Sequence, residues 1–298
     1  APVNAAHGYL DVCARLIRDR HPDEIVHAFD ADWRPAPRVA KYDGYKATRA
    51  SEPDDLGPQF DVLARVLAAV GMTLVEAPGW EAEDAIGTLC AQAKGRDRIE
   101  VVTGDRDLIQ LVRDPVVKLL FTRTGVSKLD ELDEAAVEEK YGIPPSRYAD
   151  FATLRGDPSD GLPGVPGVGE KTARALVQAY PTLDEMMAEA AGTPTRRPLK
   201  GSPGLRARVA AAADYLASMR EVVPIRTDLD LVVDREDRDD DRLDALARRH
   251  RLTGPIRRLR EALDGSEGDA PARRPGPDGR GRGTGRDRPV GRPGHPSG

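Results

Sequence analysis

The sequence predicts an α/β fold in which a mainly parallel sheet, flanked by helices, is followed by a helical region. Two patterns support this prediction. Up to about residue 131, short apolar segments alternate with segments of helical period, as in strands joined by helical crossovers. From residue 132 onward no further strand pattern is seen, so the rest is expected to be helical. Ligands of such a sheet bind beyond the carboxyl ends of its strands.

The expected elements of the first half follow in order. Residues 4–20 carry apolar side chains at helical spacing, and "EIVHAFDAD" is typical of a buried strand that ends at Asp30. Residues 34–57 are polar with little apolar period, which favours a mobile segment or a poorly packed helical excursion. Further helices are expected at 59–70 and 79–94, and further strands at 72–78, 99–107 and 116–122.

Composition divides the chain into three parts. Residues 1–131 form the expected α/β domain, and residues 132–264 form a helical domain interrupted by the low-complexity loop 192–204 around Arg196. Residues 265–298 are dominated by Gly, Pro, Arg and Asp. A segment of that composition buries too little apolar surface to fold, so a disordered, solvated tail is expected.

The overall charge gives a misleading first impression of the partner. A net charge of −5 argues against nucleic acid, but basic residues cluster in "RVAKYDGYKATRA", "GEKTARAL" and "TRRPLKGSPGLRARV". No apolar run approaches the roughly 18 residues of a spanning helix, so a soluble, cytoplasmic chain without a membrane partner is expected. Cys13 and Cys90 lie in apolar helical patterns and are interpreted as small core residues.

Acidic residues gather at four comparable places in this layout. They are Asp30 at a strand end, Glu81, Glu83 and Asp84 at a helix start, Asp105 and Asp107 at the next strand end, and Asp157 and Asp160 before a glycine-rich run. Each group alone has a structural explanation, as helix-dipole partners, caps or turns. Together they would converge on one sheet edge, where unpaired carboxylates repel each other and favour cations.

Oxygen ligands without matching His or Cys select hard ions such as Mg²⁺ or Mn²⁺. So many carboxylates suit two ions, which activate water and stabilise both oxygens of a displacement at phosphorus. Phosphodiester hydrolysis is therefore the leading chemistry. A nucleophilic side chain is less plausible, because the sequence has no G-x-S-x-G elbow and its five histidines do not cluster with a Ser or Cys.

The run "GLPGVPGVGEKTARAL" indicates a phosphate-binding turn. Gly164, Gly167 and Gly169 lie where the backbone must turn tightly or approach a ligand, just before a helix. Amides at a helix start hold phosphate without reading bases, and Lys171 and Thr172 lie in that first turn. The alternative is an ordinary connection between two helices.

These motifs resemble the bacterial 5′-3′ exonuclease and flap endonuclease family, which includes the N-terminal domain of DNA polymerase I. "PGWEAEDAIGTLC", "VVTGDRDLIQLV" and "GDPSDGLPGVPGVGEKTA" occur in the family's order between about residues 2 and 262. The resemblance implies a PIN-like (resolvase-like) nuclease domain followed by a helix-hairpin-helix (H3TH) subdomain. It also implies a K⁺ ion held by the hairpin carbonyls and an arch-like segment over 34–57. In that segment Lys46 and Arg49 would grip the scissile phosphate, and Arg38 and Tyr45 would contact DNA.

The sequence departs from the family in two places. Glu83 stands where the family has Asp, which adds a methylene to an expected ligand. The family's first strand, which ends in Asp-Gly and supplies a metal ligand, has no counterpart here. We therefore expect an N-terminally truncated chain that is less stable and much less active than a complete homologue.

Three functions fit these observations. The first is a structure-specific nuclease that acts in replication and repair on double-stranded DNA with 5′ ends or flaps, with RNA-primed DNA as a further candidate substrate. It would be a stand-alone monomer. The second is a DNA-binding protein of the same family that has lost catalysis with the missing Asp. The third, a PIN-like ribonuclease, is disfavoured by the hairpin and the arch-like segment.

Overall fold

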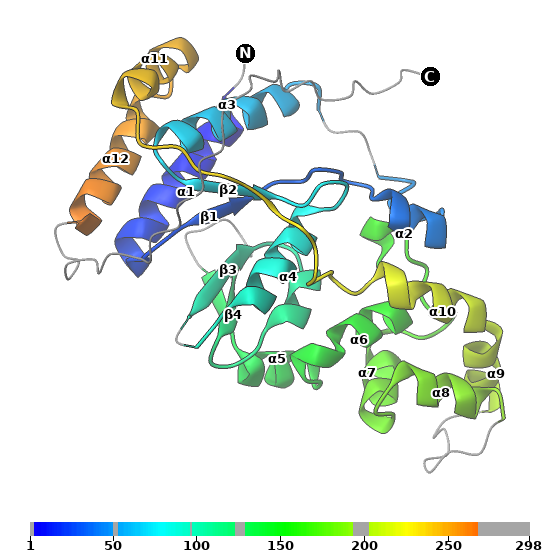
Figure 1. Ribbon diagram of the computed structural model, residues 1–298. Coiled ribbons are helices and arrows are strands. Elements are labelled where there is room, and N and C mark those ends of the chain that lie inside the picture. The colour runs from blue at the N-terminus through cyan, green and yellow to red at the C-terminus, as the bar shows by residue number, and fades with distance from the viewer. Residues whose placement is uncertain (1–2, 50–52, 96, 123–128, 193–202, 268–298) are drawn as a thin grey trace.

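The computed structural model describes residues 3–49, 53–95, 97–122, 129–192 and 203–267 (Figure 1). Most of the loop 192–204, including Arg196, most of the tail 265–298, and residues 50–52 of the arch-like segment lie outside these ranges. None of the described helices is long and apolar enough to cross a membrane.

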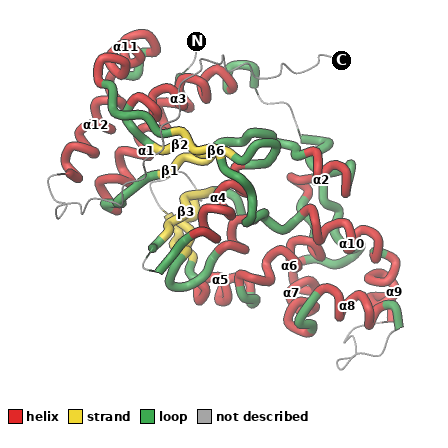
Figure 2. Tube along the Cα trace, in the orientation of Figure 1, coloured by secondary structure: helices red, strands yellow, loops and turns green. Residues whose placement is uncertain are grey.

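The strands form two small sheets rather than one (Figure 2). In one sheet, β1 (Val26–Ala28) runs parallel to β2 (Thr73–Glu76), and β6 (Val232–Asp234) pairs antiparallel with β2. In the other, β3 (Ile99–Thr103) runs parallel to β4 (Val117–Thr122), and β5 (Leu129–Leu132) pairs antiparallel with β4. The α/β class and the parallel crossovers are thus as expected, but antiparallel strands border both sheets.

Strand β6 corrects the expectation that no strand follows residue 132. Val232 and Val233 keep half or more of their surface exposed, at 50% and 58%. The strand is defined by backbone pairing with β2 and not by burial. It therefore leaves no apolar alternation in the sequence that would have revealed it.

One core joins the two ends of the described chain. Helices α1 (Asn4–Arg20) and α3 (Gly57–Ala69) pack with α11 (Asp240–His250) and α12 (Thr253–Glu267). Leu10, Ile17, Leu243 and Leu259 are fully buried there, within one apolar cluster. The Asp11 carboxylate accepts two hydrogen bonds from Arg258. The C-terminal helices therefore cover the N-terminal helix, while the domain division proposed at residue 131 stays a prediction.

The second core lies beneath the sheet of β3, β4 and β5 and continues into the helical region. The aromatic side chains of Tyr141, Tyr148 and Phe151 meet at its centre. It is built from the 3₁₀ helix η1 (Asp107–Leu111) and from α4 (Ala82–Gln92), α5 (Glu134–Tyr141), α6 (Tyr148–Arg155), α7 (Glu170–Ala179), α8 (Leu183–Ala190), α9 (Pro203–Ala211) and α10 (Ala213–Val222).

The arch-like segment is better packed at its base than its composition suggested. It contains a short helix, α2 (Ala36–Lys41), in agreement with the helical excursion that was one of the two expectations, but the packing is closer than expected. Arg38, Tyr45 and Lys46 are buried there, at 3%, 5% and 7% exposure. Arg38 and Lys46 pair there with buried acidic side chains, and Tyr45 joins the apolar core. Charged residues paired in this way leave no apolar period in the sequence.

Candidate metal centre

Helix α4 begins at the centre of the acidic site. Glu81 is its N-cap, and a capping box joins it to Asp84, whose carboxylate accepts a bond from the Glu81 amide at 3.4 Å. Both carboxylates are buried, at 2% and 0% exposure. A capping pair satisfies backbone donors at a helix start and places acids near the positive end of the helix dipole.

Asp30 lies just after β1 and reaches the same helix start. Its Oδ1 accepts a hydrogen bond from the Ala82 amide at 2.8 Å. The neighbouring amides of Ala31 and Asp32 donate to the carbonyl of Trp80, so the loop after β1 lies along the start of α4. The charge of Asp30 contributes to the raised pKa of Glu83, after burial, so the two carboxylates lie close enough to repel each other.

Asp105 and Asp107 follow β3 in a tight turn. Asp105 Oδ1 accepts from the Asp107 amide at 2.8 Å, and the Asp105 amide donates to Thr103. Asp107 then begins η1. The two carboxylates therefore lie side by side at the carboxyl end of a strand, as the sequence predicted.

The fourth acidic group, Asp157 and Asp160, lies against the base of the arch-like segment. Asp157 caps the short 3₁₀ turn η3 (Pro158–Asp160), and the carbonyl of Asp160 accepts from the Lys46 amide at 2.9 Å. Gly161 has φ +72°, and a Cβ atom there would overlap the carbonyl of Gly44. Only glycine allows this close approach of two backbones.

Two cations already neutralise Glu81. Its carboxylate forms ion pairs with Lys46 and Arg38 and accepts from the hydroxyl of Tyr45 at 2.6 Å. Lys46 Nζ also lies 4.0 Å from Asp160. Burial lowers the pKa of Lys46, but Glu81 and Asp160 outweigh it, so the pKa is raised and the ammonium is stabilised.

The acids farther from these cations behave differently. Burial raises the pKa of Glu83 to about 7, and the charges of Asp30 and Glu81 add to it. Burial also raises the pKa of Asp107 to about 8, with Asp105, Asp160 and Asp157 contributing next. These carboxylates repel one another without a counter-ion, which is the electrostatic signature of a site that accepts cations.

A cavity of about 20 Å³ opens among these groups. It is lined by Lys46 and by Glu81, Glu83, Asp105, Asp107 and Asp160, among others. That volume accommodates a water molecule or one small ion. Carboxylate oxygens are the ligands of hard divalent ions, so the donor set fits Mg²⁺ or Mn²⁺.

The present spacing of the carboxylates is wider than that of a closed ligand set. Among the described residues, no three His, Cys, Asp or Glu side chains are grouped closely enough to hold a metal ion as they stand. The physical reason lies in the ion pairs: Glu81 and Asp84 are turned toward Arg38 and Lys46. Binding of a cation therefore requires side chains to rearrange.

The predicted phosphate-gripping and DNA-contacting residues fall into two groups. Arg49, Lys171 and Gly169 are exposed or face open space, and Thr172 is half-buried in the first turn of α7. Gly164 and Gly167 both adopt φ +70°, as the tight hairpin turn requires. In contrast, the side chains of Arg38 and Tyr45 are buried against acids and are not presented to solvent.

Three residues of this neighbourhood were missed by sequence reasoning. Trp80 places its ring beside the guanidinium groups of Arg38 and Arg226, at 5.7 and 5.4 Å. The Arg226 amide donates to Asp84 at 2.9 Å, and Gln110 bonds the Ile225 amide. These contacts join residues 42 to 146 positions apart in the chain, so no local pattern predicts them.

Comparison with known proteins identifies the family. Residues 1–142 match the model of the 5′-3′ exonuclease N-terminal resolvase-like domain, and residues 143–245 match that of the 5′-3′ exonuclease C-terminal SAM fold. The 5′-3′ exonuclease of Streptomyces coelicolor is 44% identical over 88% of this chain and 91% of its own. DNA polymerase I of Mycobacterium tuberculosis is 48% identical over 62% of this chain but only 20% of its own.

Solved structures share the fold at low identity. A phage T5 D15 flap endonuclease, in a complex with DNA and metal ions, covers 88% of this chain and 91% of its own with a TM-score of 0.57 and 17% identity. The catalytic core of Rad2 with DNA covers 85% and 80%, with a TM-score of 0.51 and 17% identity. The predicted resolvase-like fold is thereby confirmed. Family models and relatives together show that the chain belongs to the 5′-3′ exonuclease family.

Proposed function

We propose that this chain hydrolyses phosphodiester bonds of DNA near 5′ ends and at 5′ flaps, using divalent metal ions. One observation carries the proposal. Acidic residues from three separate segments line a small cavity, and one of them, Asp107, has its pKa raised to about 8 by burial and by its acidic neighbours. Such a site favours cations, and the family supplies the substrate class.

Two ions, Mg²⁺ or Mn²⁺, are proposed at this site. Bound there, they would activate water and stabilise the charge that develops on the scissile phosphate. Asp105 and Asp107 face Asp157 and Asp160 across the site, as the mutual effects of their charges indicate. The proposed ligands are Asp30, Glu81, Glu83, Asp105, Asp107, Asp157 and Asp160.

Lys46 and Arg49 are proposed to receive the scissile phosphate. Lys46 lines the cavity and now pairs with Glu81, so it is already at the point where a phosphate would arrive. Arg49 is exposed one turn further along the same segment. A phosphate oxygen would replace Glu81 as the partner of Lys46, which would free Glu81 to bind a metal ion.

The hairpin is proposed to hold the duplex some distance from the reaction. Gly169 is the N-cap of α7, and Lys171 is exposed in the first turn. Amides at a helix start bind phosphate without reading the sequence. A K⁺ ion bound by carbonyls of the Gly164 to Gly169 turn belongs to the same proposal.

The wider setting is proposed from the family. Substrates would be double-stranded DNA with 5′ ends or flaps, including RNA-primed DNA, in replication and repair. The chain would act as a cytoplasmic monomer. The alternative of a DNA-binding protein without catalysis has no observation in its favour.

Cleavage of a 5′-labelled flap duplex in Mg²⁺, beside binding of the same DNA in Ca²⁺, tests the proposal. We expect metal-dependent cleavage that Asp107→Ala lowers by about 10³-fold or more, since loss of a metal site costs several kcal/mol of transition-state stabilisation. Asp19→Ala, at an exposed position of α1 where Asp19 pairs with Arg15, is the matched control and should cleave normally. Unchanged cleavage by Asp107→Ala would refute the proposed centre, and binding without cleavage would favour the DNA-binding alternative.

A further inference from the structure

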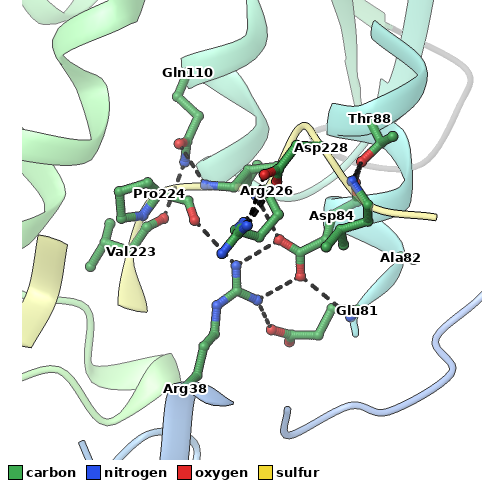
Figure 3. Close-up of polar contacts among 12 residues, drawn as sticks. Arg38, Glu81, Ala82, Asp84, Thr88, Gln110, Val223, Pro224, Arg226 and Asp228 are labelled. Carbon is green, nitrogen blue, oxygen red and sulfur yellow. Dashed lines mark hydrogen bonds and ion pairs between the residues drawn. The ribbon is translucent and has the colours of Figure 1, made fainter. Parts of the chain in front are cut away.

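We propose that Arg38 and Asp84 form a buried ion pair that positions Glu81 for metal binding, so that Arg38 is a positioning residue and Asp84 its fixed partner. This assignment differs from the roles expected from sequence, a DNA contact for Arg38 and a metal ligand for Asp84. It rests on the proposed metal-dependent function. The pair joins three parts of the chain: α2, the start of α4, and the segment 223–228 that follows α10 (Figure 3).

The carboxylate of Asp84 is fully used by protein donors. Oδ1 accepts from Arg38 Nη2 at 2.7 Å and from the Arg226 amide at 2.9 Å. Oδ2 accepts from Arg38 Nη1 at 2.8 Å and from the Glu81 amide at 3.4 Å. A carboxylate offers about four acceptor positions, and all four are occupied. With 0% exposure, Asp84 is poorly placed to bind a metal ion.

Both terminal nitrogens of Arg38 bind more than one partner, whereas its buried Nε has no hydrogen-bond partner among the described residues. Its guanidinium makes the two bonds to Asp84, pairs with Glu81, and donates to the carbonyl of Pro224 at 3.3 Å. The rings of Tyr45 and Trp80 lie 5.8 and 5.7 Å from it. Bidentate pairing combined with aromatic contact requires the planar fork of arginine, which lysine does not provide. A guanidinium at 3% exposure does not reach a DNA backbone.

The segment 223–228 is fastened to α4 and η1 by further contacts. The Ile225 amide donates to Gln110 Oε1 at 2.9 Å, and Gln110 Nε2 reaches the carbonyl of Val223 at 3.4 Å. A Cβ atom on Gly87 would overlap Ile225, so α4 and this segment are in direct backbone-level contact. Figure 3 shows the bonds of Gln110 to this segment beside the bonds that join Asp84 to Arg38 and Arg226.

The consequence concerns Glu81. Its Oε2 is bound by Arg38 and Tyr45, whereas Oε1 faces Lys46 and the cavity. One oxygen is therefore fixed and the other is left for exchange between Lys46 and a cation. If Arg38 is loosened, Oε2 loses one of its two bonds while that of Tyr45 stays, so Glu81 is oriented less firmly and the metal site loses part of the support of a ligand.

A double-mutant cycle on Mn²⁺ affinity tests the pair. We expect Arg38→Lys and Asp84→Asn each to weaken Mn²⁺ binding by about tenfold, as loss of outer support does, and the double variant to be no weaker than either. Lys41→Gln, on the exposed side of α2 where Lys41 pairs with Glu221, is the matched control and should bind Mn²⁺ normally. Additive losses, or a much larger loss in Asp84→Asn than in Arg38→Lys, would overturn the proposal.

Two further readouts separate this role from DNA contact and from misfolding. Amide exchange at Ile225 and Arg226 should accelerate in Arg38→Lys, while flap DNA affinity in saturating Ca²⁺ and its salt slope stay within twofold of the parent. A DNA ligand would instead reduce the salt slope by about one and leave amide exchange unchanged. Mn²⁺ binding and amide exchange need no cleavage, so they test the pair even if the proposed nuclease activity fails.

Discussion

Two halves of one acidic site are prepared in opposite ways. At the start of α4, Glu81 and Asp84 are buried with Arg38 and Lys46 and are neutralised within the protein. At the end of β3, Asp107 is surrounded by Asp105, Asp157 and Asp160 and has a raised pKa. Carboxylates therefore form fixed ion pairs within the protein at the start of α4, whereas at the end of β3 they form a site that favours the binding of cations. The difference lies in the neighbouring counter-charges rather than in the acids themselves.

Among the variants that test this comparison, removal of the Lys46 ammonium has the largest expected effect. Lys46→Met should leave Glu81 less neutralised and raise its affinity for Mn²⁺, because a competing cation is gone. Cleavage should nevertheless fall by about 100-fold, since the ammonium no longer stabilises the phosphate. Titration calorimetry and single-turnover cleavage measure the two effects.

The essential result for Lys46→Met is that the affinity for Mn²⁺ rises while the cleavage rate falls. Arg49→Met, which changes an exposed cation of the same segment, should lower cleavage without raising Mn²⁺ affinity. Weaker Mn²⁺ binding in Lys46→Met would show that Lys46 supports the metal site instead of competing with it.

The base of the arch-like segment contacts the turn that contains Asp157 and Asp160, and substitution of Gly161 should weaken this contact. An alanine there would sit at φ +72° and overlap the Gly44 carbonyl. We expect Gly161→Ala to lower the free energy of unfolding by about 1–3 kcal/mol, from backbone strain and displacement of the two segments. Denaturant unfolding measures this.

Gly169→Ala provides the comparison for that variant. Its φ is −90°, and a Cβ atom there meets nothing within 4 Å. It should change stability by less than about 0.5 kcal/mol. Equal stability of the two variants would contradict the tight docking of the arch base.

The raised pKa values predict a modest pH dependence of stability without metal. The folded-state pKa values of Glu83 and Asp107, about 7 and about 8, lie above those of the unfolded chain. Between about pH 4 and 8 the folded protein therefore holds more protons than the unfolded one, so stability falls as pH rises. In EDTA the melting temperature should drop by several degrees from pH 5.5 to 8.5, and Mg²⁺ should restore it. A pH-independent melting temperature, or an equal drop in Asp107→Asn, would argue against burial and charge repulsion of these carboxyl groups as the cause.

The sequence revealed the elements that carry local patterns. The helices over 4–20 and 79–94 and the strand that ends before Asp105 were predictable, because apolar period and strand-end acids are visible over a few residues. The two-sheet arrangement was not, since β6 is exposed and paired only through its backbone. The acids of the site were identified together, but their counter-charges were not.

Arg38 shows why that part of the site escaped prediction. Its basic neighbours in "RVAKYDGYKATRA" indicated a DNA-facing surface, whereas its guanidinium is buried against residues 43 to 186 positions away. A charged residue in a polar segment is expected to be solvated. Only tertiary structure shows that two buried carboxylates and two aromatic rings hold it.

The central claim is that the acids at the start of α4 are neutralised within the protein, whereas those at the end of β3 are not. Its most direct test is the number of protons released when a metal ion binds. Calorimetric titration with Mg²⁺ at pH 7, in two buffers of different ionisation enthalpy, counts them. The account predicts release of between about one and two protons, because Asp107 is largely protonated and Glu83 about half protonated at that pH, and both must ionise to bind. Asp107→Asn should abolish most of that release, while Asp84→Asn should retain it. Binding without proton release in the parent protein would contradict the claim that unneutralised acids at the end of β3 form the metal site.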